Sequence, residues 1–214
     1  MRNMAIEKAS KGRLGIILSR LRVFDKAKVR VEQYPTDSEI AAQMLWEAHL
    51  RGDIEGKVIV DLGCGTGILG IGALILGARM VYFIDNDKES MDITKINLEN
   101  VKSESYITGK VDFLVKDVKE FSGKGDVVMQ NPPFGVQNKG NDRAFLNKAM
   151  ETAPVVYSFR KSESNKFIKA FSAERGYIVN GYWEFNFPIK ATQKFHTRRI
   201  YRFKVGCWRL EKER

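Results

Sequence analysis

The chain has 214 residues, 43% of them hydrophobic, which is enough to bury one sizeable core. With two cysteines, Cys64 and Cys207, and two histidines it can build neither a disulfide framework nor a Cys/His zinc cluster, so we expect no metal. The longest apolar run covers residues 68–78 and contains three glycines, whereas a membrane-spanning helix needs about 20 apolar residues. Because residues 1–4 lead into no signal-like hydrophobic stretch, we expect a cytoplasmic protein without a membrane segment.

The positive charge is concentrated at the two ends of the chain. Lys and Arg number 36 against 26 Asp and Glu, which gives a net charge of +10. Residues 1–30 and residues 186–214 each contain nine basic and two acidic side chains, so the two ends together carry +14 and the middle carries −4. Such an excess suits a polyanion, because each Lys or Arg set against a phosphate releases condensed counterions. The alternative is a solvated basic surface.

In chain order, the first expected elements are a basic helical segment around residues 3–20 and a helix near residues 37–50, with Thr36 or Asp37 as its cap. Strands and helices then alternate. We expect strands at 57–62, 80–85, 110–115, 125–130 and 153–158, and helices at 66–76, 88–99, 142–151 and 162–174. After Gly176, strand-like stretches at 177–185 and 199–208 have no comparable helix between them.

This alternation predicts an α/β, Rossmann-like fold with a mostly parallel seven-stranded sheet, an antiparallel hairpin at one edge and helices on both faces. We expect one domain over residues 1–214, with a basic helical extension at 1–36 and a basic hairpin at 177–214.

A glycine-rich loop follows the first expected strand, where sheets of this kind bind their ligands. Asp61 precedes three glycines at alternate positions, Gly63, Gly65 and Gly67, which allow a tight turn and close approach of the backbone to a ligand. Asp85 ends the next strand, where a carboxylate accepts hydrogen bonds from ribose hydroxyls. Together they predict a cofactor that contains adenosine.

Two cofactors fit this pattern, a nicotinamide dinucleotide and S-adenosylmethionine. Residues 65–70 also fit the G-x-G-x-x-G dinucleotide fingerprint, which favours a nicotinamide cofactor. The negative charge of Asp61, however, suits an ammonium or sulfonium group better than a pyrophosphate. The arrangement also resembles the first motif of class I S-adenosylmethionine-dependent methyltransferases. In that superfamily the position of Asp117 holds the adenine amino group, although Asp117 is equally typical of an ordinary turn.

The tetrapeptide Asn131-Pro132-Pro133-Phe134 follows the fourth expected strand. The two prolines fix the local backbone, so the Asn131 side chain and the Pro132 carbonyl can both accept hydrogen bonds from one amino group. Phe134 offers a ring on which an extruded base can stack, worth about 1–3 kcal/mol. The motif resembles the signature of amino-methyltransferases, which leaves adenine N6, guanine N2 and a glutamine amide open as acceptors.

Further segments resemble methyltransferase-like protein five and its archaeal relatives. They are Glu32–Thr36, Asn131–Phe134 with residues 139–146, Val156–Ser158 and Phe187–His196, and they occur in the same order as in that family. The resemblance implies N6-methylation of adenine in small-subunit ribosomal RNA, with guanine N2-methylation of ribosomal or transfer RNA and glutamine methylation of a release factor as alternatives. A catalytically idle RNA-binding module is the alternative from another class.

The resemblance also implies roles for individual residues. The residues that it places against S-adenosylmethionine are Gln33, Thr36, Gly63, Thr66, Ile68, Asp85, Asp117 and Val118. Lys194, His196, Arg198 and Arg199 are expected to form an RNA-binding strip. Eukaryotic members work with a small zinc-binding activator protein. We expect such a partner at the third strand, residues 110–115, if that strand lies at a sheet edge.

Overall fold

The computed structural model describes residues 10–24, 35–133, 141–190 and 200–213. The helices are α1 (Lys11–Ser19), α2 (Ser38–Leu50), α3 (Ile68–Ile75), α4 (Lys88–Glu104), α5 (Asn141–Thr152) and α6 (Asn165–Ala173), with short 3-10 turns η3 (Val118–Glu120) and η4 (Ser162–Ser164). The strands are β1 (Val58–Leu62), β2 (Met80–Asp85), β3 (Lys110–Val115), β4 (Val127–Gln130), β5 (Val155–Lys161), β6 (Tyr177–Lys190) and β7 (Ile200–Lys212). None of the described helices is long and apolar enough to cross a membrane.

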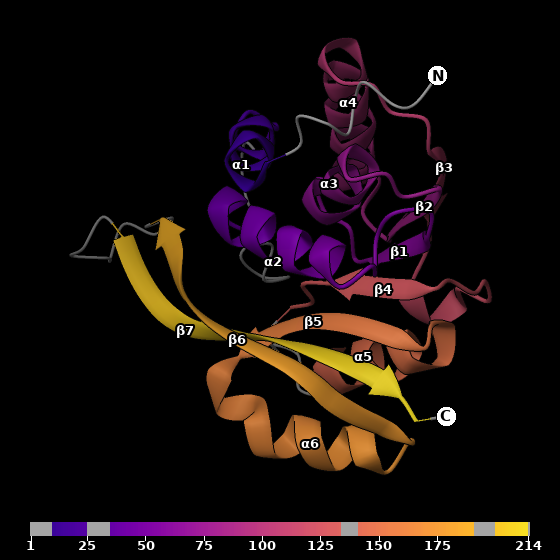
Figure 1. The fold of residues 1–214 in the computed structure, drawn as a ribbon, viewed down its shortest axis with the longest axis vertical. Coiled ribbons are helices and arrows are strands. Elements are labelled where there is room, and N and C mark those ends of the chain that lie inside the picture. The colour runs from indigo at the N-terminus through magenta and orange to yellow at the C-terminus, as the bar shows by residue number, and fades with distance from the viewer. Residues whose placement is uncertain (1–9, 25–34, 134–140, 191–199, 214) are drawn as a thin grey trace.

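The seven strands form one sheet in the order β3-β2-β1-β4-β5-β7-β6 (Figure 1). The first five in that order pair in parallel, and β7 runs antiparallel to both β5 and β6. The chain order reverses between β1 and β4, which is the position where sheets of this kind bind ligands. The predicted fold class is confirmed, including the antiparallel pair at one edge and the position of β3 at the other.

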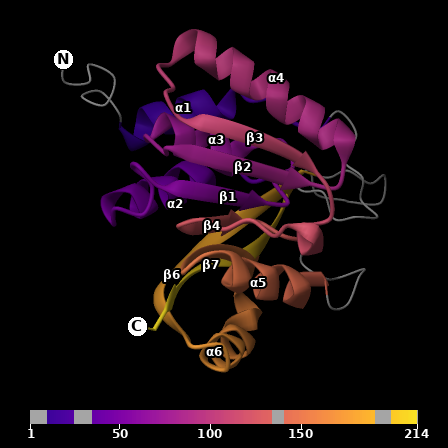
Figure 2. The same cartoon turned by 90° about the vertical axis from the view of Figure 1, so that its right-hand side faces the viewer.

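Helices cover both faces of the sheet (Figure 2). One core contains buried side chains of α1, α2, α3 and α4, and a second contains those of α5 and α6. Strand β1 contributes to both because its side chains alternate, with Ile59 in the first core and Val60 and Leu62 in the second. The nearly all-apolar helix α3 is therefore surrounded by protein, with α2 on its outer side.

Several element boundaries differ from the predicted ones for local reasons. Helix α3 begins at Ile68 and not at residue 66, because Gly67 has a left-handed φ of 84° and ends the loop instead of continuing the helix. Helix α6 begins at Asn165, because residues 162–164 form a 3-10 turn. Helix α4 continues to Glu104, five residues beyond the prediction.

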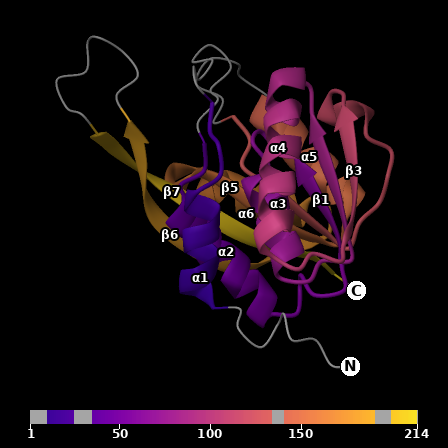
Figure 3. The same cartoon turned by 90° about the horizontal axis from the view of Figure 1, so that it is seen from above.

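The last two strands are longer than predicted and form a ribbon that leaves the sheet. Pairing of β7 with β5 stops at the Lys161–Val205 pair, whereas residues 186–190 of β6 still pair with residues 200–204 of β7. Because β6 runs parallel to β5, this ribbon extends past the sheet at the carboxyl ends of the parallel strands (Figure 3). The ribbon therefore projects on the same side as the glycine loop and Asn131.

Candidate active site

The glycine loop between β1 and α3 is held by hydrogen bonds to the end of β2. Gly63 and Cys64 donate their N–H groups to the carbonyl of Ile84, at 2.8 and 3.0 Å. The carboxylate of Asp85 accepts from the N–H of Gly65 at 2.8 Å and from the N–H of Asp87 at 2.9 Å. Burial raises the pKa of Asp85, against the lowering effect of these N–H groups. Asp85 thus organises the loop, and each carboxylate oxygen keeps a second lone pair for a ligand.

The loop depends on glycine at the predicted positions. Gly63, Gly65 and Gly67 have φ values of 69°, 55° and 84°, a region that side chains with a Cβ rarely adopt. A Cβ on Gly63 would also lie 2.9 Å from the ring of Phe145 on α5. Phe145, on the opposite face of the sheet from α3, therefore packs against the glycine loop. The sequence pattern does not reveal this contact.

Asp61, at the end of β1, is 1% exposed and points into the first core. Its carboxylate accepts from the N–H of Gly70, at 2.8 Å, in the first turn of α3. Burial raises the pKa of Asp61 to about 7 and the charge of Asp85 adds to the rise, whereas the Gly70 hydrogen bond opposes it. A nearby cation would favour the ionised carboxylate.

An asparagine that sequence reasoning missed joins the N-terminal segment to the glycine loop. Asn97 on α4 is fully buried, and its Nδ2 donates to the carbonyls of Arg22 and Thr66, at 3.0 and 2.9 Å. Its Oδ1 accepts from the N–H of Arg22 at 2.8 Å. Phe24 then lies beside Gly65, 3.7 Å from the position of a Cβ there. No local signal marks Asn97, since its partners are distant in the sequence.

Asn131 follows β4 and lies partly buried beside the start of α2. Its Nδ2 donates to the hydroxyl of Thr36 at 2.9 Å. Its Oδ1 is shielded from solvent and accepts no hydrogen bond from any residue that the structure describes. Leaving a buried hydrogen-bond acceptor without a donor costs about 1–3 kcal/mol of stability. A ligand that donates a hydrogen bond to this oxygen would remove that cost. The following residue, Pro132, is buried and fixes the backbone.

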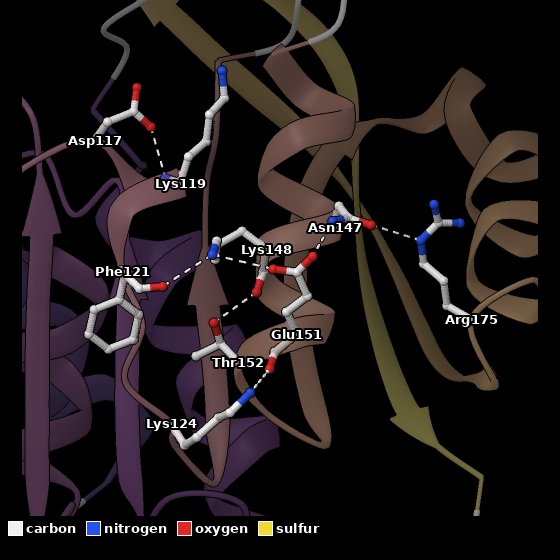
Figure 4. A network of polar contacts seen from close by, with 9 residues as sticks. All are labelled: Asp117, Lys119, Phe121, Lys124, Asn147, Lys148, Glu151, Thr152 and Arg175. Atoms are coloured by element: carbon white, nitrogen blue, oxygen red, sulfur yellow. Dashed lines mark hydrogen bonds and ion pairs between the residues drawn. The ribbon is translucent and has the colours of Figure 1, made fainter.

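Asp117 and Val118 lie at the start of η3, beyond the end of β3. Asp117 caps this turn by accepting from the N–H of Lys119 at 2.8 Å, and Val118 is buried. The turn is held against α5, because Nζ of Lys148 donates to the carbonyl of Phe121 at 3.1 Å (Figure 4). Asp117 thus has the turn role that the sequence left open, and its predicted contact with adenine remains a prediction.

The structure brings most of the predicted site residues together at the carboxyl ends of β1, β2, β3 and β4. These residues are Thr36, Asp61, Gly63, Gly65, Thr66, Gly67, Ile68, Asp85, Asp117, Val118, Asn131, Pro132 and Pro133. The predicted Gln33, Phe134, Lys194, His196, Arg198 and Arg199 lie outside the described residues. The contact roles assigned to individual residues remain predictions.

The site fits a cofactor that carries adenosine and a positive charge. Among the described residues, a Cβ on Gly65 would meet only Phe24 within 4 Å, so these residues leave the backbone of the loop open on that side. Two carboxyl groups with raised pKa values, the buried Asp61 and the partly buried Asp85, flank the loop. Their charges disfavour a pyrophosphate and favour a cation, which speaks against the dinucleotide interpretation of residues 65–70.

Comparisons with known proteins give the family. Residues 36–156 match the methyltransferase small domain. The rRNA N(6)-adenosine-methyltransferase Mettl5 of Drosophila melanogaster is 33% identical over 88% of this chain and 90% of its own. Protein MJ0284 of Methanocaldococcus jannaschii, whose function is uncharacterised, is 33% identical over 94% of both chains. The crystal structure of PH1948 from Pyrococcus horikoshii, described as a candidate RNA methyltransferase, is 42% identical, covers 95% of this chain and 98% of its own, and has a TM-score of 0.87.

The matches to the two relatives and to PH1948 cover 88–95% of the chain and confirm the resemblance that the motifs indicated. The family is one of S-adenosylmethionine-dependent methyltransferases, in agreement with the geometry of the glycine loop. The chain belongs to the methyltransferase small-domain family, in the group that includes the METTL5 rRNA N(6)-adenosine-methyltransferases.

Proposed function

We propose that the chain is one S-adenosylmethionine-dependent methyltransferase domain that acts on N6 of adenine in RNA, with small-subunit ribosomal RNA as its substrate. The observation that carries this proposal is the buried Oδ1 of Asn131, which accepts no hydrogen bond from the described residues and lies at the same end of the sheet as the glycine loop. An exocyclic amino group supplies the donor that this oxygen lacks. The Drosophila relative is named as an rRNA N(6)-adenosine-methyltransferase, which supports adenine and ribosomal RNA.

The residues of the site explain how an amino group of low nucleophilicity would react. The lone pair of an adenine N6 is delocalised into the ring. When Oδ1 of Asn131 and the carbonyl of Pro132 accept its two hydrogens, the nitrogen is drawn toward a pyramidal geometry in which the lone pair can attack. The bound cofactor would supply an electrophilic methyl group on a sulfonium. As the new N–C bond forms, the S–C bond breaks with its electron pair left on the thioether sulfur, and the methylated nitrogen then loses one proton to solvent. Asp61, Asp85 and the backbone of residues 63–67 would hold that cofactor.

The charge of the chain supports RNA over a protein substrate. The ribbon of β6 and β7 projects on the side of the site, and it leads to the basic residues 191–199. Glutamine methylation of a release factor would leave the charge of +14 at the two ends unused. Lys and Arg at such positions bind phosphate without reading sequence. We place this reaction in the cytoplasm, where ribosomal subunits are present.

The direct test is transfer of labelled methyl from S-adenosylmethionine to purified small-subunit ribosomal RNA and, separately, to transfer RNA. Nucleoside digestion and mass identification then give the product. We expect N6-methyladenosine from ribosomal RNA. N2-methylguanosine would replace adenine by guanine as the acceptor, and absence of transfer in the presence of a candidate activator would favour the idle RNA-binding module.

The exposed edge of the sheet at β3 supports a place for a small zinc-binding activator. In the described part of the chain β3 pairs only with β2, and its residues Lys110, Asp112 and Val115 are exposed. Lys110 and Lys116 donate their N–H groups toward β2, to the carbonyls of Arg79 and Asp85. Because N–H groups alternate along a strand, the N–H of Val115 points away from β2, on the side where no described strand pairs with β3 and a partner strand could.

Replacing Val115 by proline is expected to weaken activator binding at least about tenfold, because it removes one of the outward N–H groups from the edge. Val115 is 49% exposed, so little core packing is lost. Co-purification and titration with the activator measure the effect, and Val115→Thr is the matched control that keeps the N–H. Equal activator binding by the proline and threonine variants would exclude this edge as the docking site.

Cofactor affinity is expected to depend on pH through Asp61. In the cofactor-free protein the pKa of this carboxyl is about 7, so it holds a proton below that pH. A cationic cofactor favours the ionised form, and binding below pH 7 must therefore release the proton. The dissociation constant for S-adenosylmethionine should be about tenfold larger at pH 6 than at pH 8. Isothermal titration with Asp61→Asn, whose profile should be flatter, measures the contribution of the carboxyl; identical profiles for the two proteins would contradict it.

A further inference from the structure

The amide of Asn131 serves the proposed reaction in only one of its two orientations. With Oδ1 toward the acceptor, the side chain accepts a hydrogen from the amino group. With the amide rotated by 180°, an N–H donor would face the N–H donors of the substrate, and the contact would be repulsive. The site therefore needs a group that holds this side chain in place, while the amino group of the acceptor favours the first orientation.

Thr36 is the group that meets the other end of this amide. Its hydroxyl oxygen accepts from Nδ2 of Asn131 at 2.9 Å, and Oδ1 is the buried end of the amide to which no described residue donates. The two residues are 95 positions apart, so the contact exists only in the folded chain. It links the residue before the N-cap of α2 to the residue just after β4.

The start of α2 gives Thr36 a fixed position. The next residue, Asp37, caps the helix by accepting from the N–H groups of Glu39 and Ile40, at 3.0 and 3.2 Å. The helix itself is anchored through its buried residues Ile40, Ala41, Met44 and Leu45. A hydroxyl next to the capping residue of such a helix is held more precisely than one in the middle of a loop.

We propose that Thr36 is a positioning residue for methyl transfer: by binding Nδ2 of Asn131 it presents Oδ1 to the amino group of the acceptor. This inference rests on the proposed function. It differs from the role of Thr36 that the family resemblance implies, which is contact with S-adenosylmethionine. The two roles affect different kinetic quantities, since a cofactor contact determines cofactor affinity and a positioning contact determines kcat.

The test uses the full-length protein with Thr36→Val and Thr36→Ser. Valine has nearly the shape of threonine but no hydroxyl, and we expect it to lower kcat about tenfold while the dissociation constant for S-adenosylmethionine changes less than about twofold. Serine keeps the hydroxyl and should restore most of kcat. A weakened cofactor affinity with unchanged kcat would assign Thr36 to the cofactor and overturn the positioning role.

A double-mutant cycle and a spectroscopic measurement complete the test. Thr36→Val should have no further effect in an Asn131→Ala background, because the group that it positions is gone. In ¹⁵N-labelled protein, the Asn131 side-chain amide hydrogens should exchange more rapidly with solvent in Thr36→Val than in the wild type, whether or not RNA is methylated. Additive effects in the cycle, or equal exchange rates, would overturn the positioning role alone. Absence of methyl transfer by the wild type would overturn the proposed function, and the positioning role with it.

Discussion

Replacing Asn131 by alanine is expected to lower kcat for RNA methylation about 100- to 1000-fold, the size of effect seen when one preorganised hydrogen-bonding group is removed from a reacting centre. The expected loss is this large because Oδ1 of Asn131 is buried and already in place before the substrate binds. The dissociation constant for S-adenosylmethionine, measured by calorimetry, should stay within about twofold of the wild-type value. Single-turnover rates with saturating RNA give the chemical step directly.

Asn131→Asp is the matched control for this experiment. A carboxylate of the same length keeps an acceptor oxygen toward the amino group, so this variant should retain more activity than Asn131→Ala. A kcat for Asn131→Ala within about threefold of the wild type would remove Asn131 from the reaction and, with it, the basis of the proposed mechanism.

The sequence predicted the fold because the pattern of apolar residues is local and strong. Buried strands such as β1 and β2 are short apolar runs next to glycine or charged residues, and their period differs from that of the helices between them. The predicted starts of α3 and α6 were wrong because they depend on details of the backbone that apolar periodicity does not encode. These details are the left-handed φ of Gly67 before α3 and the 3-10 turn at residues 162–164 before α6.

The candidate site was predictable where a motif is contiguous and unpredictable where it is assembled by tertiary contacts. Residues 61–67 and Asn131 stand out in the sequence because their chemistry depends on close spacing. The hydrogen bonds of Asn97 to Arg22 join residues 75 positions apart, and Phe145 reaches Gly63 from another element. Such contacts follow from how helices pack on the sheet, which the periodicity of a single sequence leaves undetermined.

A buried ion pair, which the sequence analysis did not predict, links strand β7 to the loop before β1. Arg209 on β7 binds Asp53, in the loop before β1, through Nε at 2.7 Å and Nη2 at 3.2 Å. Tyr157, the β5 partner of Arg209 in the sheet register, donates its hydroxyl to the same carboxylate at 2.6 Å. Burial and the carboxylate of Asp53 raise the pKa of Tyr157, so the phenol stays protonated and remains a donor.

Replacing Arg209 by methionine is therefore expected to lower the free energy of unfolding by about 3–5 kcal/mol. Asp53 is only 8% exposed, and it would keep the hydrogen bond from Tyr157 but lose its counter-charge. Urea denaturation monitored by tryptophan fluorescence and circular dichroism gives the difference. Because β7 carries half of the ribbon beside the site, methyl transfer at saturating cofactor should also fall as the strand loosens.

The double variant Asp53→Leu/Arg209→Met is the matched control, since it removes both charges and leaves none buried alone. Replacing a buried ion pair by apolar residues of similar volume is often close to neutral, so the double variant should be more stable than Arg209→Met by about 2 kcal/mol or more. A double variant that is less stable than Arg209→Met would show that the hydrogen bonds of Asp53, and not its uncompensated charge, determine the cost. A loss below about 1 kcal/mol in Arg209→Met would mean that water reaches Asp53, and β7 would then be held by its strand pairing and apolar side chains alone.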